Sequence, residues 1–551
     1  MTLVDVGRYW RTLRHLPLRQ LAWLAWRRVL RQPRRVAQPR DVGLRAGFVA
    51  PRLVPLAEPC RLGPCRFRFL DHTVDFAGAV DWAAGGQSRL WQYNLHYFEW
   101  LRQADVDAAA AAGLVDDWIS ANPPFGGTGW EPYTLALRVV NWTGAIPADG
   151  WTRVRLDSFA LQTAWLLANL EHHIRANHLL ADIKGLLFAG ALLDGEHGRR
   201  LLARGQALLR RELPEQFLRD GGHYERSPMY HLLVTRDLVE IGRLMAANPA
   251  CFDPALRDDV ERCTARALAC AADLVRPDGE PAAFNDSAGG VAPRLRDLLD
   301  RATTEEGHEV RIIARADSGY YGARRGGDWL LLDCGPVAPD YQPGHTHCDL
   351  LAFELCLDGR PVVVNCGVYD YTPGPRRTYV RSTAAHNTLS VDGAEQSEVW
   401  GAFRVGRRAR PLAARLELAG AGFEFAGSHD GFRVLPGCVT HERRVVTDPA
   451  FAVITITDRL TGSRPHAVNG WLHVAPGLVA VETPRGIDLS EDGRVVATIG
   501  HRGWNAVELR AGERHPRFGQ IATAPTLAFS AGGELPLELQ FEIRRGRGNV
   551  T

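Results

Sequence analysis

The chain has 551 residues, of which 46% are hydrophobic and 23% charged, a balance typical of folded globular proteins and not of disordered ones. Its 65 lysines and arginines nearly balance its 63 aspartates and glutamates, so the formal net charge is only +2. No overall positive field is available to attract nucleic acid, and an acidic ligand must be bound by local groups. At roughly 100–200 residues per domain, we expect two to four structural units.

The first residues have the pattern of a basic amphipathic helix around the apolar run 21–26. The arginines of this pattern are Arg8, Arg11, Arg14, Arg19, Arg27 and Arg28. The run lacks the longer apolar core and the cleavage site of a secretory signal, so we expect no cleaved leader. The pattern favours a helix docked on its own domain, and peripheral contact with an anionic membrane surface is the alternative. We assign residues 1–75 to this helix and an irregular extension.

Residues 76–305 are predicted to be helical, because apolar residues such as Phe159 and Trp165 recur there at helical spacing. Glycine and proline clusters at residues 122–127 and 220–222 divide this half into helix pairs in series. No glycine pattern of a dinucleotide or triphosphate site opens a helix, so we expect no nucleotide cofactor.

Residues 306–551 change to short β-branched runs. Several of these runs end at turn signals such as Asp358-Gly359 and Asp392-Gly393. Runs of this kind predict antiparallel sheets packed as a sandwich. We place the boundary between the helical half and the sheet half near residues 303–308.

Aromatic residues mixed with polar ones mark the start of the helical half. Such a mixture suits a sugar-binding wall, because pyranose faces stack on rings while their hydroxyl groups need fixed donors and acceptors. A helix core with polar tips is the alternative. The candidate substrate-binding residues here are Asn94, His96, Tyr97, Trp130, Glu131, Tyr133 and Arg138.

Two further helical motifs carry reactive side chains. Asn177 and His178 stand side by side at the start of a long apolar helical pattern. Ser227 is a good N-cap, which places Tyr230 in the first turn of the next helix. There the positive end of the helix should lower the pKa of the tyrosine, as a tyrosine base requires. A capping asparagine and a tyrosine packed in the core are the structural alternatives.

The sheet half holds a His-x-His motif at the start of a strand. Residues two apart on a strand share a face, so His345 and His347 can point into one site. His386, at the start of a later strand, could complete a pair of imidazoles around Zn²⁺. The third ligand is open at this stage, with Asp349 and Asn365 as candidates.

Together these motifs resemble the heparinase II/III-like polysaccharide lyases over about residues 90–410. The motifs that carry the resemblance are Asn177-His178, Ser227-Pro-Met-Tyr230, Gly344-His-Thr-His347, Asn365-Cys-Gly-Val-Tyr369 and Ser382-Thr-Ala-Ala-His-Asn-Thr388. The resemblance implies an α+β multidomain fold, in which an N-terminal α/α toroid precedes a C-terminal antiparallel β-sandwich and the cleft lies between them. The tract from Val391 to Trp400 looks like the branch found in bacterial exopolysaccharide clusters.

Lyases of this family remove the C5 proton of a uronic acid and expel the 4-linked sugar, which leaves a C4–C5 unsaturated uronate. The resemblance implies that Asn177 and His178 bind the carboxylate of an acidic polysaccharide substrate. It also implies that Tyr230 and His345 act as acid and base, in an order set by the C5 configuration. Further expected substrate contacts are Tyr224, Glu225 and Tyr369. Tyr224 is also the alternative to Tyr230 as the catalytic tyrosine.

The family's structural zinc site of His, Asp and His corresponds here to His347, Asn365 and His386. An amide carries no charge, so this set should bind zinc more weakly than one with a carboxylate. We expect a structural zinc ion, with Asp349 as a substitute ligand or an empty site as the alternatives.

Two other functions stay open. A glycoside hydrolase would need a pair of carboxylates across the bond that is cleaved, for which Glu131, Glu225 and Asp286 are candidates. A polysaccharide-binding or exopolysaccharide assembly protein would keep the cleft without turnover. The scattered cysteines suggest a reducing compartment, so a cytoplasmic or inner-membrane-associated location is favoured, and a periplasmic one stays open.

Overall fold

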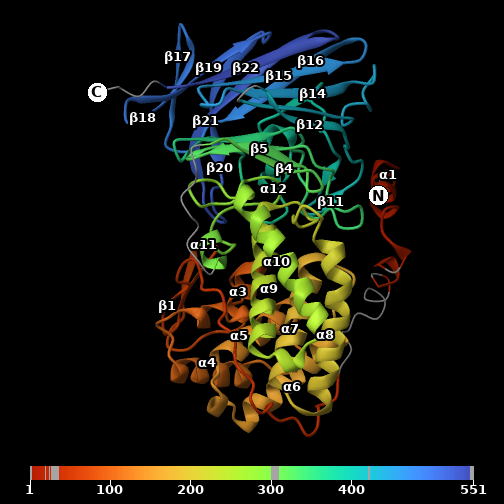
Figure 1. Cartoon of the computed structure of the whole chain (residues 1–551), viewed down its shortest axis with the longest axis vertical. Coiled ribbons are helices and arrows are strands. Elements are labelled where there is room, and N and C mark those ends of the chain that lie inside the picture. Colours follow the sequence, from red (N-terminus) through yellow and green to blue (C-terminus); the bar gives the residue numbers. More distant parts are fainter. Residues whose placement is uncertain are drawn as a thin grey trace.

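The computed structural model describes residues 3–18, 20–23, 25, 36–299, 309–419 and 422–546. Helices form one half of the molecule and sheets the other, as Figure 1 shows. The predicted order of a helical domain and then an antiparallel sheet domain is therefore confirmed. The predicted boundary at residues 303–308 lies outside the described residues, as do Arg19, Arg27 and Arg28 of the basic N-terminal pattern.

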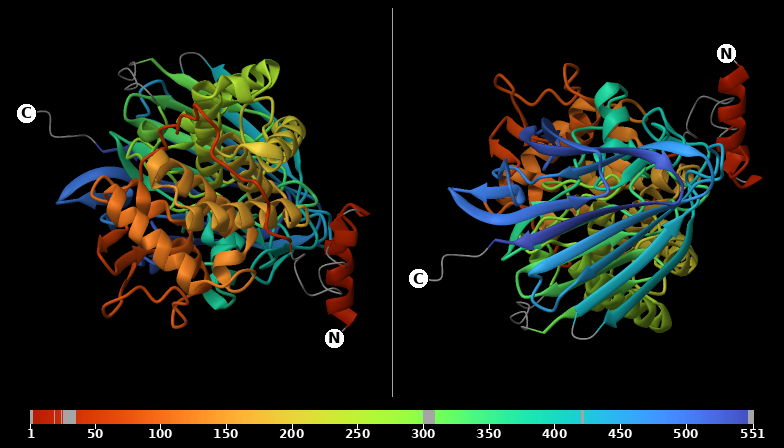
Figure 2. Two further views of the ribbon diagram at one scale, coloured as in Figure 1. Left: turned by 90° about the horizontal axis from the view of Figure 1, so that it is seen from below. Right: turned by 90° about the horizontal axis from the view of Figure 1, so that it is seen from above.

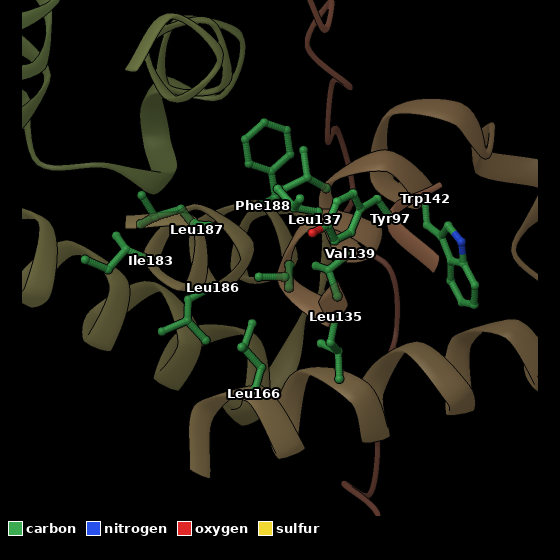
Figure 3. Packing of buried hydrophobic residues seen from close by; sticks show 14 of the residues in the cluster. Tyr97, Leu135, Leu137, Val139, Trp142, Leu166, Ile183, Leu186, Leu187 and Phe188 are labelled. Carbon is green, nitrogen blue, oxygen red and sulfur yellow. The ribbon is translucent and has the colours of Figure 1, made fainter. Parts of the chain in front are cut away.

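The helical half is built around α7, whose residues are buried on nearly every side. A helix that is apolar all round belongs in the centre of a domain. Figure 3 shows α7 side chains such as Ile183 and Leu186 packed beside Leu135 of α5 and Leu166 of α6. The helices are α1 (Leu3–Leu13), α3 (Arg89–Tyr97), α4 (Ala108–Ala121), α5 (Pro132–Ala145), α6 (Arg153–Ala168), α7 (Ala176–Leu192), α8 (Gly195–Gln216), α9 (Pro228–Ala247), α10 (Pro254–Leu274) and α11 (Leu295–Leu298).

Side-chain caps set where several of these helices begin. Thr152 caps α6, Ser227 caps α9 and Asp253 caps α10, each accepting a hydrogen bond from a backbone N–H of the first turn. Gly190 permits α7 and α8 to approach closely, because a Cβ atom there would lie 2.7 Å from the backbone nitrogen of Leu202. The helices therefore occur as neighbouring antiparallel pairs, as the Gly and Pro breaks predict.

The N-terminal extension is more regular than the sequence indicates. It contains a small antiparallel sheet of β1 (Arg61–Gly63), β2 (Arg66–Phe69) and β3 (His72–Asp75). Phe67 and Phe69 are buried and contact the rings of Trp100 and Trp91. This sheet therefore packs on the helical domain and shares its core.

Among the described residues, the sheet domain contains three large antiparallel sheets and a two-stranded one of β10 and β11, drawn in Figure 1 and seen from above in Figure 2. The strand orders of the three large sheets are β4-β5-β6-β7-β8, β20-β21-β16-β9 and β12-β13-β14-β15-β22-β19-β18-β17. Burial alternates along β14 and β15, as expected for strands with one face on a core.

The bounds of the elements of this domain are β4 (Arg311–Arg315), β5 (Tyr320–Arg325), β6 (Asp328–Asp333), β7 (Phe353–Leu357), β8 (Arg360–Val363), α12 (Pro375–Val380), β9 (Leu389–Val391), β10 (Val399–Trp400), β11 (Arg404–Val405), β12 (Pro411–Ala419), β13 (Gly422–His429), β14 (Thr440–Thr447), β15 (Val453–Thr461), β16 (Pro465–His473), β17 (Val479–Thr483), β18 (Gly486–Glu491), β19 (Arg494–Arg502), β20 (Ala506–Arg514), β21 (Ala522–Glu534) and β22 (Leu537–Arg545).

The two domains are joined where α10 meets the first sheet. Cys270 and Leu274 of α10 share a buried apolar cluster with Trp329 and Leu331 of β6. The indole N–H of Trp329 also donates to the carbonyl of Asp273 at 3.0 Å. This interface fixes the distance between the helical domain and the sheets, and so the width of the cleft between them.

Candidate active site

A cleft of about 1430 Å³ lies between the helical domain and the sheet domain. That volume exceeds the usual 300–1,000 Å³ of small-molecule pockets, so the cleft suits a larger ligand. The helical domain contributes Asn177, His178 and Tyr230 to its lining, and the sheet domain contributes His345 and Tyr371. All four residues predicted to be catalytic therefore line one cleft.

His178 is placed to carry a positive charge at the start of α7. Its Nδ1 lies 2.9 Å from an oxygen of Glu171, and its ring packs 4.4 Å from the ring of Tyr133. Burial disfavours the charged imidazole, but the charge and hydrogen bond of Glu171 raise the pKa of His178. Neighbouring Asn177 also lines the cleft, and its backbone N–H donates to Glu225 at 3.4 Å. A cationic imidazole and an amide in the first turn of a helix form a site suited to an anion.

Tyr230 lies in the first turn of α9, as predicted, and its backbone N–H donates to Ser227 Oγ. Its hydroxyl group is 3.0 Å from that of Tyr371, and its ring stacks on His345 with the centroids 3.9 Å apart. The predicted lowering of its pKa is wrong. Burial, followed by the neighbouring Tyr371, raises the pKa of Tyr230 well above its usual value, because loss of water outweighs the partial charge of the helix end. Tyr230 therefore keeps its proton in the free protein.

His345 is oriented by a buried carboxylate. Its Nδ1 lies 2.9 Å from Asp286 Oδ2, so we assign the Nδ1 proton to this hydrogen bond. Its Nε2 lies 3.6 Å from Glu225, too far for a hydrogen bond. The lone pair of Nε2 is therefore free to accept a proton.

Asp286 was expected only as a hydrolase carboxylate, but it organises this part of the cleft. Its oxygens also accept from His347 Nε2 at 2.8 Å and from both terminal nitrogens of Arg377. Burial opposes ionisation, yet the charge of Arg377 and the hydrogen bonds of His345 and His347 hold the pKa of Asp286 well below its usual value. The lowered pKa favours the ionised form of Asp286, which fixes the tautomer of His345.

The loop that carries Asp286 has an unusual backbone. Asn285 adopts φ 55°, in the left-handed region that asparagine tolerates better than most residues. Its side chain accepts from the backbone N–H of His347 at 3.0 Å and donates to the carbonyl of Arg226 at 2.8 Å. Asn285 thus connects the histidine motif to the loop before α9, which carries Tyr230.

Several predicted substrate contacts lie in the core instead. Arg138 is fully buried, lies 3.9 Å from the ring of Trp118 and donates to Gln162. His96 accepts from Trp118, and burial lowers its pKa to about 3. Trp130 is buried against Trp165. For these three residues the alternative of a helix core with polar tips is correct. Asn94, Tyr97, Glu131 and Tyr133 do line the cleft.

The remaining predicted contacts lie behind the cleft wall. Tyr224 is only 3% exposed, and Glu225 is fully buried beneath His345 and Asn177. Tyr369 contacts His515 and Arg376 rather than the cleft. Tyr371, two residues further along, lines the cleft instead and lies beside Tyr230. The repeated tyrosine in this stretch was the available signal for Tyr371.

The residues of the predicted zinc site come together only in part. His347 Nδ1 and His386 Nε2 face each other at 3.3 Å. Two imidazole nitrogens bound to one tetrahedral zinc ion, each at the usual Zn–N distance of about 2.0–2.1 Å, would lie a similar distance from each other. Asn365 instead uses its carbonyl oxygen to accept from Asn387 at 3.3 Å.

A complete ligand set is missing among the described residues, which hold no group of three His, Cys, Asp or Glu side chains placed around one metal ion. Asp349 accepts from the backbone of Asn285 at 2.6 Å, and burial raises its pKa to about 7. The residues present therefore supply two imidazoles but no charged oxygen ligand. Structural zinc stays a prediction, and no step of the chemistry considered below needs it.

Comparison with known families agrees with this geometry. The model described as "Heparinase II/III N-terminus" matches residues 148–301, and the model described as "Heparinase II/III-like, C-terminal" matches residues 311–538. The chain belongs to the heparinase II/III-like family. Both matched regions contribute to the cleft, which therefore lies between the family's two characteristic domains.

Curated relatives include two heparin-sulfate lyases. The one from Bacteroides thetaiotaomicron is 22% identical over 402 residues, which cover 58% of this chain and 54% of the relative. The one from Pedobacter heparinus is 24% identical over 344 residues, which cover 55% of this chain and 48% of the relative. The chain thus spans about half the length of the curated relatives it matches.

Solved structures show the same fold. The crystal structure of heparinase III has a TM-score of 0.71 and 16% identity, and the match covers 96% of this chain and 90% of that one. A mutant of the heparan sulfate lyase HepC from Pedobacter heparinus has a TM-score of 0.59 and 17% identity, with 97% and 89% covered. The α/α toroid followed by a β-sandwich is therefore the fold of this heparinase II/III-like protein.

Asn365→Asp tests the zinc prediction directly. A carboxylate beside two imidazoles adds a charged oxygen ligand, so the variant should bind zinc more tightly than the wild type. Zinc titration against a competing chelator measures this, and Asn505→Asp, on an exposed turn of the sandwich, is the control. Equal affinity in Asn365→Asp and wild type would show that residue 365 is not part of a metal site.

Proposed function

We propose that this protein is a polysaccharide lyase that cleaves a 4-linked, uronic-acid-containing polysaccharide of the glycosaminoglycan type by β-elimination. The observation that carries the proposal is the meeting of a protonated tyrosine, a histidine with a free lone pair and an anion-binding His-Asn pair in one cleft. The names of the curated relatives support this substrate class. The tract 391–400 supports an exopolysaccharide as a further substrate candidate.

The first task of such an enzyme is to neutralise the uronate. His178 and Asn177 hydrogen-bond the carboxylate, and the charge of His178 favours the enolate that develops when the C5 proton leaves. Glu171 raises the pKa of His178 and so favours the charged imidazole. The His178 side chain is 32% exposed, and its partly buried position strengthens the interaction relative to one in water.

The proton then moves from C5 to His345. The Nε2 lone pair accepts it, while Asp286 stabilises the imidazolium that forms. The C5–H electrons form the C4–C5 double bond, and the C4–O4 bond breaks. Tyr230 gives its proton to O4 of the leaving sugar, and Tyr371 stays hydrogen-bonded to the phenol oxygen. The structure supports this order because Tyr230 is protonated and His345 has a free nitrogen before substrate binds.

The two other functions are less well supported. A glycosidase needs one carboxylate as acid and another as base or nucleophile. Asp286 cannot serve, since His345, His347 and Arg377 occupy both of its oxygens. A protein that only binds polysaccharide would not need a free histidine nitrogen beside a protonated tyrosine.

The test is a continuous ultraviolet assay on a panel of 4-linked uronate polymers that includes heparan sulfate, hyaluronan, alginate, polyglucuronate and an exopolysaccharide of the source organism. The wild type should generate the absorbance of an unsaturated uronate. Tyr230→Phe and His345→Ala should each reduce turnover by about 10²–10⁴-fold. New reducing ends without absorbance would indicate a hydrolase, and saturable binding without products would indicate a binding protein.

Glu171→Gln should move the pH dependence of KM. Carboxylate binding needs charged His178, so it is complete below the pKa of His178 and is lost as the pH rises through it. Because Glu171 raises that pKa, its removal should shift the rise in KM to lower pH. KM measured across pH tests this against Glu196→Gln, an exposed control on α8. An unchanged profile would remove His178 from carboxylate recognition.

We also propose that α1 contacts an anionic membrane surface, which fits the expected membrane-associated location. Val6 and Trp10, one helical turn apart, form an apolar stripe of the helix and are 47% and 67% exposed. The opposite face, which carries Arg11 and Thr12, is held by the sandwich. The exposed Arg14 near this apolar stripe complements anionic lipid headgroups. None of the described helices is both long enough and apolar enough to cross a bilayer.

Trp10→Ser should weaken binding to phosphatidylserine-containing vesicles by about tenfold or more, since burial of a large apolar side chain contributes roughly 1.5–3 kcal/mol. Vesicle sedimentation measures this, with pure phosphatidylcholine vesicles as the uncharged comparison. Val434→Ser, which changes an exposed apolar residue of the sandwich, is the control. Equal binding of Trp10→Ser and wild type contradicts the proposal. If the wild type forms a dimer in the absence of lipid and Trp10→Ser is monomeric, the stripe binds a second copy of the chain instead.

A further inference from the structure

The N-terminal segment is attached to the sandwich by its helix. Arg11 donates to both oxygens of Glu398 at 2.8 and 2.7 Å. The indole N–H of Trp400 donates to Thr12 Oγ1 at 3.1 Å, and the ring of Tyr9 meets that of Trp400 with the centroids 4.9 Å apart. Charge, hydrogen-bond and ring contacts thus hold α1 at this rim of the cleft.

A few residues later the same segment contacts the toroid. Gln20 is 5% exposed, and its amide nitrogen donates to the carbonyl oxygens of His173 at 3.0 Å and of Tyr341 at 3.3 Å. His173 belongs to the toroid and Tyr341 to the sandwich domain. The ring of Trp23 adds a contact to His172. The described residues 8–18 and 20–23, which we call the clasp, therefore reach from one domain to the other.

The clasp is also a wall of the substrate cleft. Tyr9, Thr12, Leu13, Leu16 and Gln20 all line the cavity that contains the catalytic residues. Ring contacts lie both at the clasp and at the reaction centre. His345 contacts the ring of Phe403 at 6.3 Å, and Trp400, three residues before Phe403, contacts Tyr9. The clasp therefore bounds the cleft on the side of His345 where Phe403 and Trp400 lie.

The opposite end of the cleft is bounded differently. Figure 1 places α1 and the β1 region on opposite sides of the molecule. Near β1 the cleft is bounded by Glu58, Arg68 and Arg517, which are 35%, 38% and 26% exposed. Arg517 and Glu58 form an ion pair of 2.7 Å. Ion pairs between such exposed side chains contribute little and separate easily, whereas the Gln20 bridge is buried.

We propose that the clasp closes one end of the substrate cleft and makes the enzyme exolytic. The polysaccharide enters past Glu58 and Arg517, its terminal sugars stop against Tyr9, Trp400 and Gln20, and each elimination releases one product of fixed short length. This inference rests on the proposed lyase function. It adds that the substrate is recognised by a chain end and not at internal positions.

Product length is the first test. The wild type should release one short unsaturated product from the start of digestion while the polymer's viscosity falls slowly. A chain lacking residues 1–25, and Gln20→Ala as a milder variant, should release products of many lengths and lower the viscosity early. Leu18→Ala is the control, because this side chain is 84% exposed. A wild type that gives many lengths, or a shortened chain that gives the same single product, overturns the proposal.

Binding separates this inference from the function on which it rests. Tyr230→Phe titrated calorimetrically with uronate oligosaccharides of increasing length should reach constant affinity at a short length. The same variant without residues 1–25 should gain affinity with longer oligosaccharides. This binding measurement needs no turnover. If the ultraviolet assay shows no product but the removal of residues 1–25 changes how affinity depends on oligosaccharide length, only the lyase function is rejected. An unchanged length dependence rejects the clasp.

Discussion

The buried Asp286 carboxylate is the charge on which the active cleft depends. Removing a carboxylate from water costs several kcal/mol even after the protein has relaxed, and only close opposite charges and hydrogen bonds offset that cost. Here both terminal nitrogens of Arg377 and one nitrogen each of His345 and His347 converge on it. Asp286 follows α10, Arg377 lies in α12, and the histidines lie between β6 and β7. One ion pair therefore positions three separate segments of the chain.

This arrangement couples the fold to the chemistry. The interface of α10 with β6 and Trp329 places the end of the toroid against the first sheet, and the loop with Asn285 and Asp286 continues from it. Asn285 bonds to both the His347 backbone and the Arg226 carbonyl, so the position of His345 relative to Tyr230 is set by backbone contacts. The acid and the base come from different domains, yet their rings stack at 3.9 Å. A shift of one domain against the other would separate them.

The sequence predicts those features that follow from local chemistry. Helical and strand periodicity gave the two domains, and the Ser227 cap placed Tyr230 in the first turn of α9. Motif resemblance brought Asn177, His178 and His345 to one cleft. Burial is a tertiary property, so the pattern could not show that Arg138 and His96 face a tryptophan cluster or that Tyr371 and not Tyr369 faces Tyr230. The wrong expectation for the Tyr230 pKa has the same origin, because a helix end is visible in a sequence and the loss of water around a side chain is not.

The two faces of α1 give the N-terminal segment two separate roles that do not compete. The face with Arg11 and Thr12 is used by Glu398 and Trp400, whereas the stripe of Val6 and Trp10 is turned to solvent. A lipid surface bound to that stripe leaves the contacts of the clasp in place. Figure 1 places α1 and β1 on opposite sides of the molecule, and Glu58, which lines the cleft, precedes β1 by three residues. A protein held by α1 would then present this end of its cleft away from the surface. This orientation suits an enzyme that acts from chain ends, since a polymer end arriving from the surrounding solution then meets the open side of the cleft.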